Sequence, residues 1–467
     1  MRFQITILLI AALSILTGLS GCIKPVEEYT NTGDLSFSED TILFDTLFTT
    51  VGSTTKKFKI YNDQSSPIQI STIRLEKQTN SMFRINVDGE AGVTFNDVIV
   101  PAKDSLFVFV EVTIDPNNST TPQIVEDQIY FLTNGSEQRV VLNAFGQDAY
   151  FHVNEIITTN TTWPNDKPHV IYGYCAVDSA IKLTIPGGTS VHGFNNSLLY
   201  VYKGALETQG TLGNEVTFSQ SRTEDFILSP VDSTAGQWRG IYFFAPQNST
   251  LNYTQIKNAT IGIQIDTLNG QDSVSLVNVR VDNSSFAGIV TQGANLNAYS
   301  CLFGSAGAYS AFVSIGGNIR FDHCTFANYW PAQRNDPAFA FKNYYQDANN
   351  NYQYRPFSSF VLKNSIVYGS NTNELGIDTL DRSSTGSAPN FTMINTLVSY
   401  EDPVNNVEFF QNCWRNRDPE FSSTVFWDFH TSSSDVTGKG TSTDPQPDLD
   451  GNVRSITGND LGCYNNP

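Results

Sequence analysis

Apolar residues recur at fixed offsets along the second half of the chain. One column of them consists of Leu251, Leu276, Ala298, Phe321, Leu362 and Met393. A second column, always five positions further along, consists of Ile256, Val281, Phe303, Phe326, Val367 and Val398. Smaller residues stand two positions before the second column, at Thr254, Val279, Cys301, Cys324, Ser365 and Thr396. Because side chains alternate along a strand with a period of two, this pattern predicts short strands that stack with both columns inside.

The length of the repeat predicts a solenoid. Successive members of a column are at first about two dozen residues apart, close to one turn of a three-sided parallel coil. Later steps are longer, so we expect two excursions from the cylinder, within 327–358 and 369–390. A charge placed at Phe303 or Val281 should destabilise the whole stack, because each coil buries its apolar columns only against its neighbours.

A polar position lies between the two columns in every repeat. It is occupied by Tyr253, Asn278, Ser300, His323, Asn364 and Asn395. Asn tolerates left-handed backbone angles, and its amide can bond to the same amide one coil above. We therefore expect this position to form a corner of each coil.

Three upstream phrases resemble the opening coils of right-handed parallel β-helix repeat proteins. They are Leu183 to Val191, Leu206 to Thr211 and Trp238 to Phe243. The resemblance implies an all-β fold with a right-handed parallel β-helix over 148–420. Downstream, Asp448 to Arg454 and Asp460 to Tyr464 look like the closing segment of such proteins, so 421–467 is expected to cap the open end of the helix and protect its strand edges.

Residues 34–147 read as short alternating strands separated by turn residues, which is typical of a sandwich. The expected strands are Lys56–Tyr61, Ile68–Leu75, Phe83–Val87, Ser105–Ile114, Asp127–Leu132 and Arg139–Ala144. The phrases Phe58 to Asn62, Val110 to Pro116 and Leu142 to Gly146 resemble immunoglobulin-like domains of the ASPM/SPD-2/Hydin group. That resemblance implies an N-terminal immunoglobulin-like β-sandwich that acts as a spacer or interaction module.

The N-terminus has the layout of a secretory signal: Arg2, an apolar run from Ile5 to Leu16, and then small residues. The string Leu19 to Cys22 resembles the lipobox of bacterial lipoproteins, which implies a signal peptide over 1–21 and lipidation of Cys22. An uncleaved short membrane anchor is the alternative. Residues 22–33 look like a tether similar to those of surface-exported Bacteroidetes lipoproteins, so we expect an outer-membrane protein, lipid-anchored in the bilayer and displayed on the cell surface.

Charge narrows the set of partners. The net charge is −19, from 46 acidic and 27 basic residues, and no basic stripe interrupts the acidic excess. Nucleic acid is therefore excluded as an expected partner, since phosphate neutralisation is the main source of such affinity. The same acidity disfavours anionic polysaccharide unless a divalent cation or a local basic cluster intervenes.

The first excursion holds the richest set of candidate ligand-binding side chains. They are Tyr329, Trp330, Arg334, Tyr344, Tyr345, Tyr354 and Arg355. Aromatic rings stack on the apolar faces of sugars, and flanking charges supply partners for the hydroxyl groups. The loop is thus a candidate contact surface for polysaccharide or for another surface protein. The alternative is that these aromatics pack the loop onto the cylinder.

Signals of catalysis are scattered. Polygalacturonases on related scaffolds use a Gly-His-Gly and an Arg-Ile-Lys string, and neither occurs here. His323 follows Asp322 but occupies the corner position, so we expect a structural role. Asp378 and Asp381 could form a carboxylate pair of the kind used in glycoside hydrolysis, but nothing in the sequence fixes their separation.

Metal binding and disulfides are likewise weakly indicated. Cys301 and Cys324 share a column on adjacent coils and are expected as stacked reduced thiols, because parallel side chains fit a disulfide torsion poorly. No zinc-like Cys/His spacing exists, so no metal centre and no cofactor are expected. Asp448, Asp450 and Asn452 resemble a fragment of a calcium loop without its distal glutamate.

Two functions remain open at this point. The first is a noncatalytic surface lipoprotein that contacts extracellular glycan or an envelope partner. The second is a polysaccharide lyase or glycoside hydrolase on a β-helix scaffold. A convergent set of Lys, Arg and Asp on one face favours the enzyme, and an aromatic patch on a flat face favours binding.

Overall fold

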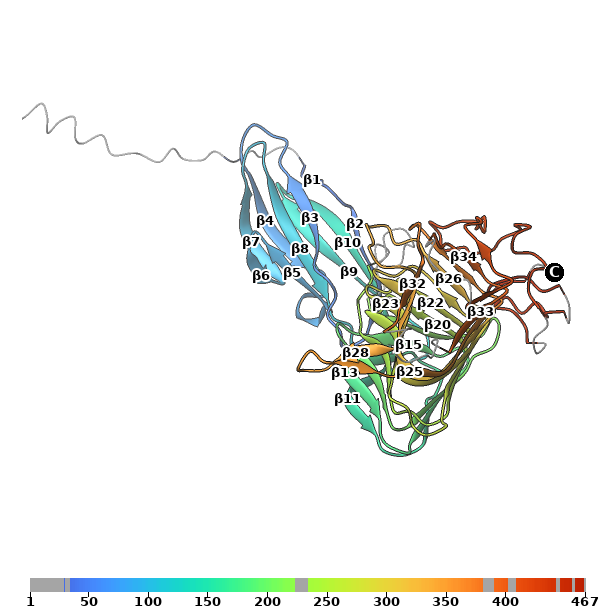
Figure 1. Cartoon of the computed structure of the whole chain (residues 1–467). Coiled ribbons are helices and arrows are strands. Elements are labelled where there is room, and N and C mark those ends of the chain that lie inside the picture. The colour runs from blue at the N-terminus through green and yellow to red at the C-terminus, as the bar shows by residue number, and fades with distance from the viewer. Residues whose placement is uncertain are drawn as a thin grey trace, which may run out of the picture. The chain divides into compact units, whose positions relative to one another are not determined.

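The computed structural model describes residue 29 and residues 34–222, 234–380, 390–401, 409–441, 446–455 and 458–465. Cys22 and Asp381 lie outside these residues. The described chain consists of strands joined by turns, with one 3₁₀ turn at Gln78–Asn80, which confirms the all-β prediction (Figure 1). In the described part of the chain, no helix has the length and apolar character needed to cross a membrane.

The contacts divide the chain into two units. The first contains the described residues up to Phe44 together with Thr50–Asp115 and Ile124–Phe145. The second contains Asp45–Thr49, Pro116–Gln123 and the described residues from Gly146 onward.

The first unit is a pair of five-stranded sheets. One sheet contains, in spatial order, β1 (Ser36–Phe37), β3 (Lys56–Tyr61), β8 (Ser105–Val112), β5 (Phe83–Val87) and β6 (Glu90–Gly92). The other contains β2 (Thr41–Phe48), β10 (Ser136–Gln147), β9 (Gln123–Thr133), β4 (Ile68–Leu75) and β7 (Thr94–Val100). Buried Phe58 of one sheet meets buried Phe131 of the other edge to face, with ring centroids 6.3 Å apart. The expected sandwich-like layering is confirmed, and β3, β4 and β5 have the expected bounds.

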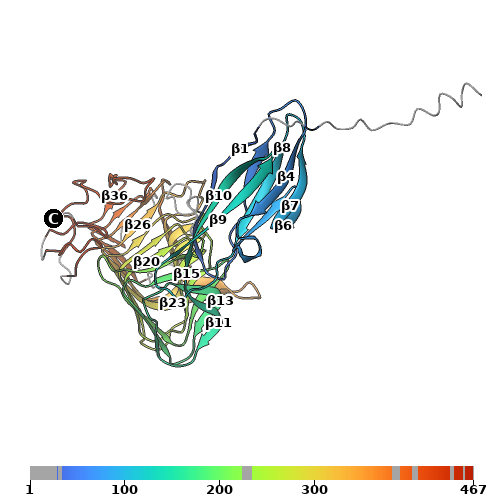
Figure 2. The same cartoon turned by 180° about the vertical axis from the view of Figure 1, so that it is seen from behind.

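The core of the second unit is a 24-stranded sheet of parallel strand pairs. Its first strands are β11 (Tyr150–Ile157), β12 (Thr161–Thr162), β13 (His169–Val177), β14 (Lys182–Pro186), β15 (Ser190–Gly193), β16 (Leu198–Tyr202), β17 (Ala205–Gln209), β18 (Val216–Gln220), β19 (Gly240–Phe244), β20 (Ser249–Lys257), β21 (Ile261–Asp266) and β22 (Val274–Asp282). They are followed by β23 (Ala287–Tyr299), β24 (Leu302–Phe303), β25 (Tyr309–Asp322), β26 (Thr325–Asn328), β27 (Phe339–Lys342), β30 (Phe357–Lys363), β31 (Ile366–Gly369), β32 (Leu375–Asp378), β33 (Phe391–Ile394), β34 (Leu397–Val398), β35 (Phe410–Gln411) and β36 (Trp414–Arg415). Figure 2 shows β11 and β13 at one end of this unit and β36 at the other.

Both predicted columns run through the interior in consecutive register. Leu251 pairs with Leu276, and the pairing continues through Ala298, Phe321, Leu362 and Met393 to Phe410. Ile256 begins the second series, which continues through Val281, Phe303, Phe326, Val367 and Val398. The predicted members of both columns are buried in one apolar core, so the predicted stacking is confirmed.

The predicted corner is also confirmed. All six of its residues have left-handed backbone angles: Tyr253 (φ 38°), Asn278 (53°), Ser300 (48°), His323 (51°), Asn364 (50°) and Asn395 (45°). Asn412 (54°) continues the series into the next coil. The expected contact between stacked amides is formed between Asn364 and Asn395.

The two excursions are shorter than predicted. Phe339 and Phe341 belong to β27, which pairs with β25 and β32 inside the sheet, and both side chains are buried in the core. Within the first excursion only the residues around 329–338 and 343–356 leave the coil, and the latter form a hairpin of β28 (Tyr344–Gln346) and β29 (Tyr352–Tyr354). Similarly, Leu375–Asp378 of the second excursion is strand β32. The sequence pattern assigns β27 to a loop because its buried core residues, Phe339 and Phe341, are aromatic like those of the excursion.

The C-terminal segment lies along the side of the coils, where the sequence predicted a cap on the open end. Leu461 and Val436 pack on the outward side chains of Ile366 and Leu397 from two successive coils. Cys463 donates its backbone N–H to the Thr325 hydroxyl at 3.0 Å. The outward positions Ile366 of β31 and Leu397 of β34 are apolar, so the C-terminal segment removes them from water.

Candidate functional site

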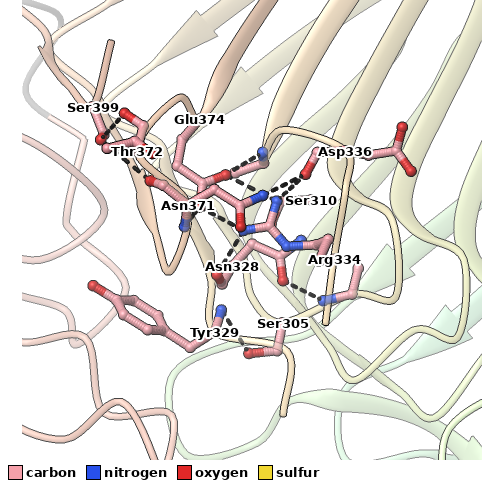
Figure 3. Close-up of polar contacts among 12 residues, drawn as sticks. Ser305, Ser310, Asn328, Tyr329, Arg334, Asp336, Asn371, Thr372, Glu374 and Ser399 are labelled. Atoms are coloured by element: carbon pink, nitrogen blue, oxygen red, sulfur yellow. Dashed lines mark hydrogen bonds and ion pairs between the residues drawn. The ribbon is translucent and has the colours of Figure 1, made fainter. Parts of the chain in front are cut away.

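A buried ion pair closes the base of the first excursion (Figure 3). Both side chains of Arg334 and Glu374 are fully buried, and the guanidinium meets the carboxylate through two nitrogens, with Nη1 2.9 Å from Oε2. Arg334 also donates to the carbonyl oxygens of Asn328 (3.1 Å) and Asp336. Glu374 accepts the backbone N–H groups of Ala338 (2.6 Å) and Asn371 (2.7 Å).

This network corrects one predicted site residue. Because Arg334 is buried and its two Nη groups donate to protein acceptors, its charge is not presented to a ligand. The pair instead ties the residues after β26 to the residues before β32. A bidentate pair with further hydrogen bonds to backbone groups is a form in which two charges are tolerated away from water.

The other predicted residues at the base of the excursion are partly buried. Tyr329 packs edge to face on Phe421 and stacks on Phe429 of the C-terminal segment, with centroids 6.2 and 6.1 Å away. Burial raises the pKa of its phenol. Tyr329 therefore follows the packing alternative, while Trp330 is half-buried next to it.

The β28–β29 hairpin carries the remaining four candidates on two opposite faces. Tyr344 pairs with Tyr354 across the hairpin, so these two rings share one face. The Tyr344 hydroxyl donates to Asp378 at 2.7 Å, and this hydrogen bond raises the pKa of Tyr344 to about 12. Arg355 lies 5.2 Å from the centre of the Tyr345 ring on the other face. The structure thus brings the candidates together in pairs and does not gather all seven on one surface.

Three further candidates from the sequence have structural partners. His323 is fully buried at its corner, with Nδ1 3.1 Å from the Asp460 carbonyl oxygen and Nε2 3.2 Å from the Asn364 amide nitrogen. Burial and the nearby Arg454 lower the pKa of His323 well below its usual value. Cys301 and Cys324 are buried free thiols, as expected.

The calcium-like fragment is organised by N–H groups. Asp448 is fully buried, and one of its oxygens accepts the backbone N–H groups of Asp450 (3.0 Å) and Asn452 (2.6 Å). Its other oxygen accepts the backbone N–H of Asn465 at 2.6 Å. With the side-chain amide of Asn452 at 3.2 Å, four hydrogen bonds to this one carboxylate fix the loop. Asp378 accepts the hydrogen bond from the Tyr344 hydroxyl. Asp381, its predicted partner in a carboxylate pair, lies outside the described residues.

An aromatic groove appears at a place that the sequence reasoning missed. Tyr200 of β16 stacks on Tyr242 of β19, with centroids 5.2 Å apart, and Tyr202 stacks on Phe244 at 5.8 Å. In the coil before, Tyr200 is preceded in register by the small Ala176. That step leaves a groove of about 530 Å³, to which Tyr174, Asn196 and Arg239 also contribute. We name this the aromatic groove, lined by Ile156, Gly173, Tyr174, Ala176, Val177, Asp178, Asn196, Leu198, Tyr200, Tyr202 and Arg239.

The signal for this groove is present in the sequence but is easy to misread. Tyr200 and Tyr202 alternate with buried Leu199 and Val201, as outward residues of a strand do. Two aromatic residues at alternate outward positions, repeated at Tyr242 and Phe244, mark a face that is aromatic rather than polar.

A second, polar groove of about 370 Å³ lies on another face of the coils. Its charged lining residues are Lys257, Arg280 and Asp282, and Phe426 and Trp427 of the C-terminal segment form part of its wall. The Asp282 carboxylate is fully buried and paired with the Arg280 guanidinium, which raises the pKa of Arg280. Among the residues lining this groove, Asp282 is the one carboxylate, and it is held behind Arg280.

The sequence matches no family model and no curated protein. Solved structures to which the chain is similar include the ASH/PapD-like domain 7 of human CEP192, at 10% identity, 28% of this chain, 94% of that chain and a TM-score of 0.17. The Escherichia coli chaperone DraB is similar at 10% identity over 25% of this chain and 55% of that chain, with a TM-score of 0.17. The catalytic domain of a GH87 α-1,3-glucanase, in complex with tetrasaccharides, is similar at 10% identity over 77% of this chain and 88% of that chain, with a TM-score of 0.18.

Likenesses of this size carry no functional argument for the chain. Its function has to be inferred from its own surfaces. Of these, the aromatic groove and the polar groove correspond to the two outcomes that the sequence left open.

Proposed function

We propose that this chain is a noncatalytic, lipid-anchored surface protein that binds neutral extracellular glycan in the aromatic groove. The observation that carries the proposal is the row of outward aromatic residues, Tyr174, Tyr200 and Tyr202, along one groove of the coiled unit. Their rings offer apolar faces next to polar groups, which is the combination that saccharides require.

The chemistry of the groove suits a sugar chain. The C–H faces of a pyranose pack on tyrosine rings, and hydroxyl groups need donors and acceptors nearby. Arg239, Asp178 and Asn196 supply both around the rings. Parallel coils repeat at about 4.8 Å, so aromatic residues on successive coils form a rigid row along which an extended glycan can lie.

Charge supports a neutral ligand. With a net charge of −19, the protein repels polyanions at long range, whereas a neutral glycan meets no such barrier. The half-buried hairpin rings at Tyr344, Tyr345 and Tyr354, with exposed Arg355, form a second proposed contact surface for glycan or an envelope partner.

The remaining parts of the proposal follow from the sequence. A lipid on Cys22 would hold the protein at the outer membrane, with the first unit as spacer. We also assign a right-handed parallel β-helix to the coiled unit, because connections between parallel strands of one sheet are right-handed in nearly all proteins.

Affinity electrophoresis in gels that contain neutral polysaccharides tests the function, because a protein that binds the polysaccharide is retarded. We expect Tyr174→Ala and Tyr200→Ala to weaken retention at least tenfold, because each removes a stacking surface. Tyr174 is 40% exposed, so its loss should leave the fold intact. Phe286→Ala, at a 43% exposed position outside the groove and the hairpin, is the control, and Tyr352→Ala, at a 58% exposed position, reports on the hairpin. Unchanged retention in both groove variants would refute binding at this groove, and a loss in Tyr352→Ala alone would transfer it to the hairpin.

A polysaccharide lyase or hydrolase remains the second candidate, and the polar groove favours it. A lyase needs a basic side chain and a cation that neutralises the substrate carboxylate, and Lys257 and Arg280 line this groove together. Glycoside hydrolysis is less well served, because it needs two carboxyl groups and the lining provides Asp282 alone. Release of unsaturated or reducing ends from any polysaccharide, abolished by Lys257→Ala, would establish the enzyme and overturn the noncatalytic proposal.

A further inference from the structure

The first coil of the second unit places an exposed carboxylate at the start of a column whose later members are interior. On the face of the coils that contains β11, β13 and β16, Glu155 pairs in register with Cys175, and Cys175 pairs with Leu199. The same column continues through Ile241, Ile263, Ile289, Ala311, Phe339 and Leu375. Every later member is apolar, so Glu155 and Cys175 are the exceptions.

A left-handed corner adds a histidine to this pair. Asn154 has φ 48°, and the register of β11 against β13 shifts between Val153 and Glu155. In a straight strand, residues three apart point to opposite faces, whereas this corner directs His152 and Glu155 to the same side. His152 is buried beside Glu155, and their Nδ1 and Oε2 atoms are in contact.

Three ligand atoms converge at this point. His152, Glu155 and Cys175 each offer one, a ring nitrogen, a carboxylate oxygen and a sulfur, and these atoms all lie within 4.8 Å of one another. Cys175 is fully buried, and the Glu155 side chain is 44% exposed. A cation among them would therefore be enclosed by protein on one side and open to water on the other.

The hydrogen bonds behind His152 decide which of its nitrogens is free. The carbonyl oxygen of Pro164 can only accept, so His169 must donate to it from Nε2, at 2.8 Å. In a neutral imidazole one nitrogen donates and the other accepts, so His169 Nδ1 is the acceptor. His152 must then donate from Nε2 to that atom, also at 2.8 Å.

With Nε2 used as a donor, Nδ1 is the nitrogen of His152 that faces the carboxylate of Glu155, and in an unprotonated ring it carries a lone pair. Two acceptors then face each other, which is favourable only if a proton or another cation lies between them. Trp163 stacks on both imidazoles, at 4.4 Å from His152 and 4.3 Å from His169, and holds their orientation. A second residue that fixes the tautomer of a histidine is the usual outer partner of a metal ligand.

We propose that His152 Nδ1, the Glu155 carboxylate and Cys175 Sγ bind a divalent transition metal of the zinc type, with His169 as positioning residue. Nitrogen, oxygen and sulfur donors together suit Zn²⁺, and three protein ligands leave a fourth position for water. Binding releases the Cys175 thiol proton to solvent as the sulfur–metal bond forms. Burial raises the pKa of this thiol, so without a cation it stays protonated and inert.

The spacing of Cys and His along the chain does not reveal this site. His152 and Cys175 lie on successive coils, and the coil register alone brings them together. The competing explanation is a protonated His152 paired with Glu155 over a buried thiol that acts as a small hydrophobe. That arrangement holds no metal, so metal binding separates the two.

Titration of the purified, metal-free protein with Co²⁺ tests the proposal. A sulfur ligand produces a charge-transfer band in the near ultraviolet, which a carboxylate–imidazole site without sulfur lacks. We expect one equivalent to bind with this band, and Zn²⁺ to displace it. Cys175→Ser should remove the band and weaken binding at least tenfold, whereas Cys413→Ser, at another cysteine of the same unit, should leave both unchanged.

The positioning role has its own readout. His169→Asn should keep the band but weaken the affinity about 10- to 100-fold, as loss of an outer partner does. If Co²⁺ gives no band in the folded protein, or if the band persists in Cys175→Ser, the site does not exist as proposed. Folding of each variant is checked by its circular dichroism, so that loss of metal is not confused with loss of structure.

Discussion

Asn395 donates its side-chain amide to the side-chain oxygen of Asn364 one coil earlier, at 3.5 Å, and both residues have left-handed backbone angles. The same Asn364 oxygen accepts the backbone N–H of Thr441 at 3.0 Å. Its amide nitrogen donates to the Asp322 carboxylate, also at 3.0 Å. One corner residue therefore links two neighbouring coils and the C-terminal segment.

Two replacements of Asn364 should separate the contribution of its side-chain hydrogen bonds from that of its left-handed backbone angle. We expect Asn364→Ala to lower the free energy of unfolding by about 2–4 kcal/mol, since buried partners lose their bonds and alanine resists a positive φ. Asn364→Gly loses the same bonds but accepts the angle, so it should be about 1 kcal/mol less harmful. Urea unfolding of both variants measures the difference. Equal losses would mean that the backbone angle contributes nothing.

The buried ion pair should respond asymmetrically to single and double replacement. Glu374→Gln leaves the Arg334 guanidinium buried without its counter-charge, and we expect a loss of about 3–5 kcal/mol. The double variant R334M/E374L removes both charges and should recover most of that loss. A double-mutant cycle by chemical unfolding provides the check. Additive losses would show that the two side chains do not act as a pair.

The acid stability of the coiled unit should depend on His323. Because burial lowers the pKa of His323 below its usual 6.5, the unfolded chain takes up a proton before the folded chain does. Stability from this residue is therefore complete above pH 6.5 and declines as the pH falls below it.

His323→Asn supplies the residue that most other coils carry at the corner, and it does not titrate. Unfolding measured at pH 7.5 and pH 5 should show a smaller loss for this variant than for the unchanged chain. His169 and His192 also have lowered pKa values, so some acid sensitivity should remain in both proteins. If the free energy of unfolding falls equally with pH in the two proteins, His323 does not contribute to the acid sensitivity.

The interior columns should be intolerant of truncation. Phe303 is fully buried and stacks on Phe326 of the next coil, with centroids 5.2 Å apart. Phe303→Ala should cost about 3–5 kcal/mol, from lost burial and the resulting cavity. Phe286→Ala, at a 43% exposed position, should cost far less and serves as the control. Thermal unfolding of the two variants compares the sites directly.

Local periodicity accounts for the part of the fold that could be predicted. The columns from Leu251 and Ile256 repeat with a constant offset because each coil packs on the next one, and the corner keeps its left-handed angle from Tyr253 to Asn395. These constraints act within one coil or between neighbours, so they leave a regular trace in the sequence.

Long-range contacts account for what could not be predicted. The burial of Arg334 depends on Glu374, which no spacing rule connects to it. Phe339 resembles the aromatic residues of a loop until its register with Leu375 is known. Likewise, Glu155 and Cys175 converge through coil register, and the aromatic groove depends on a small residue, Ala176, standing before Tyr200.

The lateral course of the C-terminal segment has a mechanical consequence. Through Leu461, Cys463 and Thr441 it fastens to residues of several successive coils, including Thr325, Ile366 and Asn395. A simple stack could unravel from its last coil one turn at a time. Here the C-terminal segment connects those coils along one side. A force applied to the carboxyl terminus must therefore detach this segment before any of the coils can unfold.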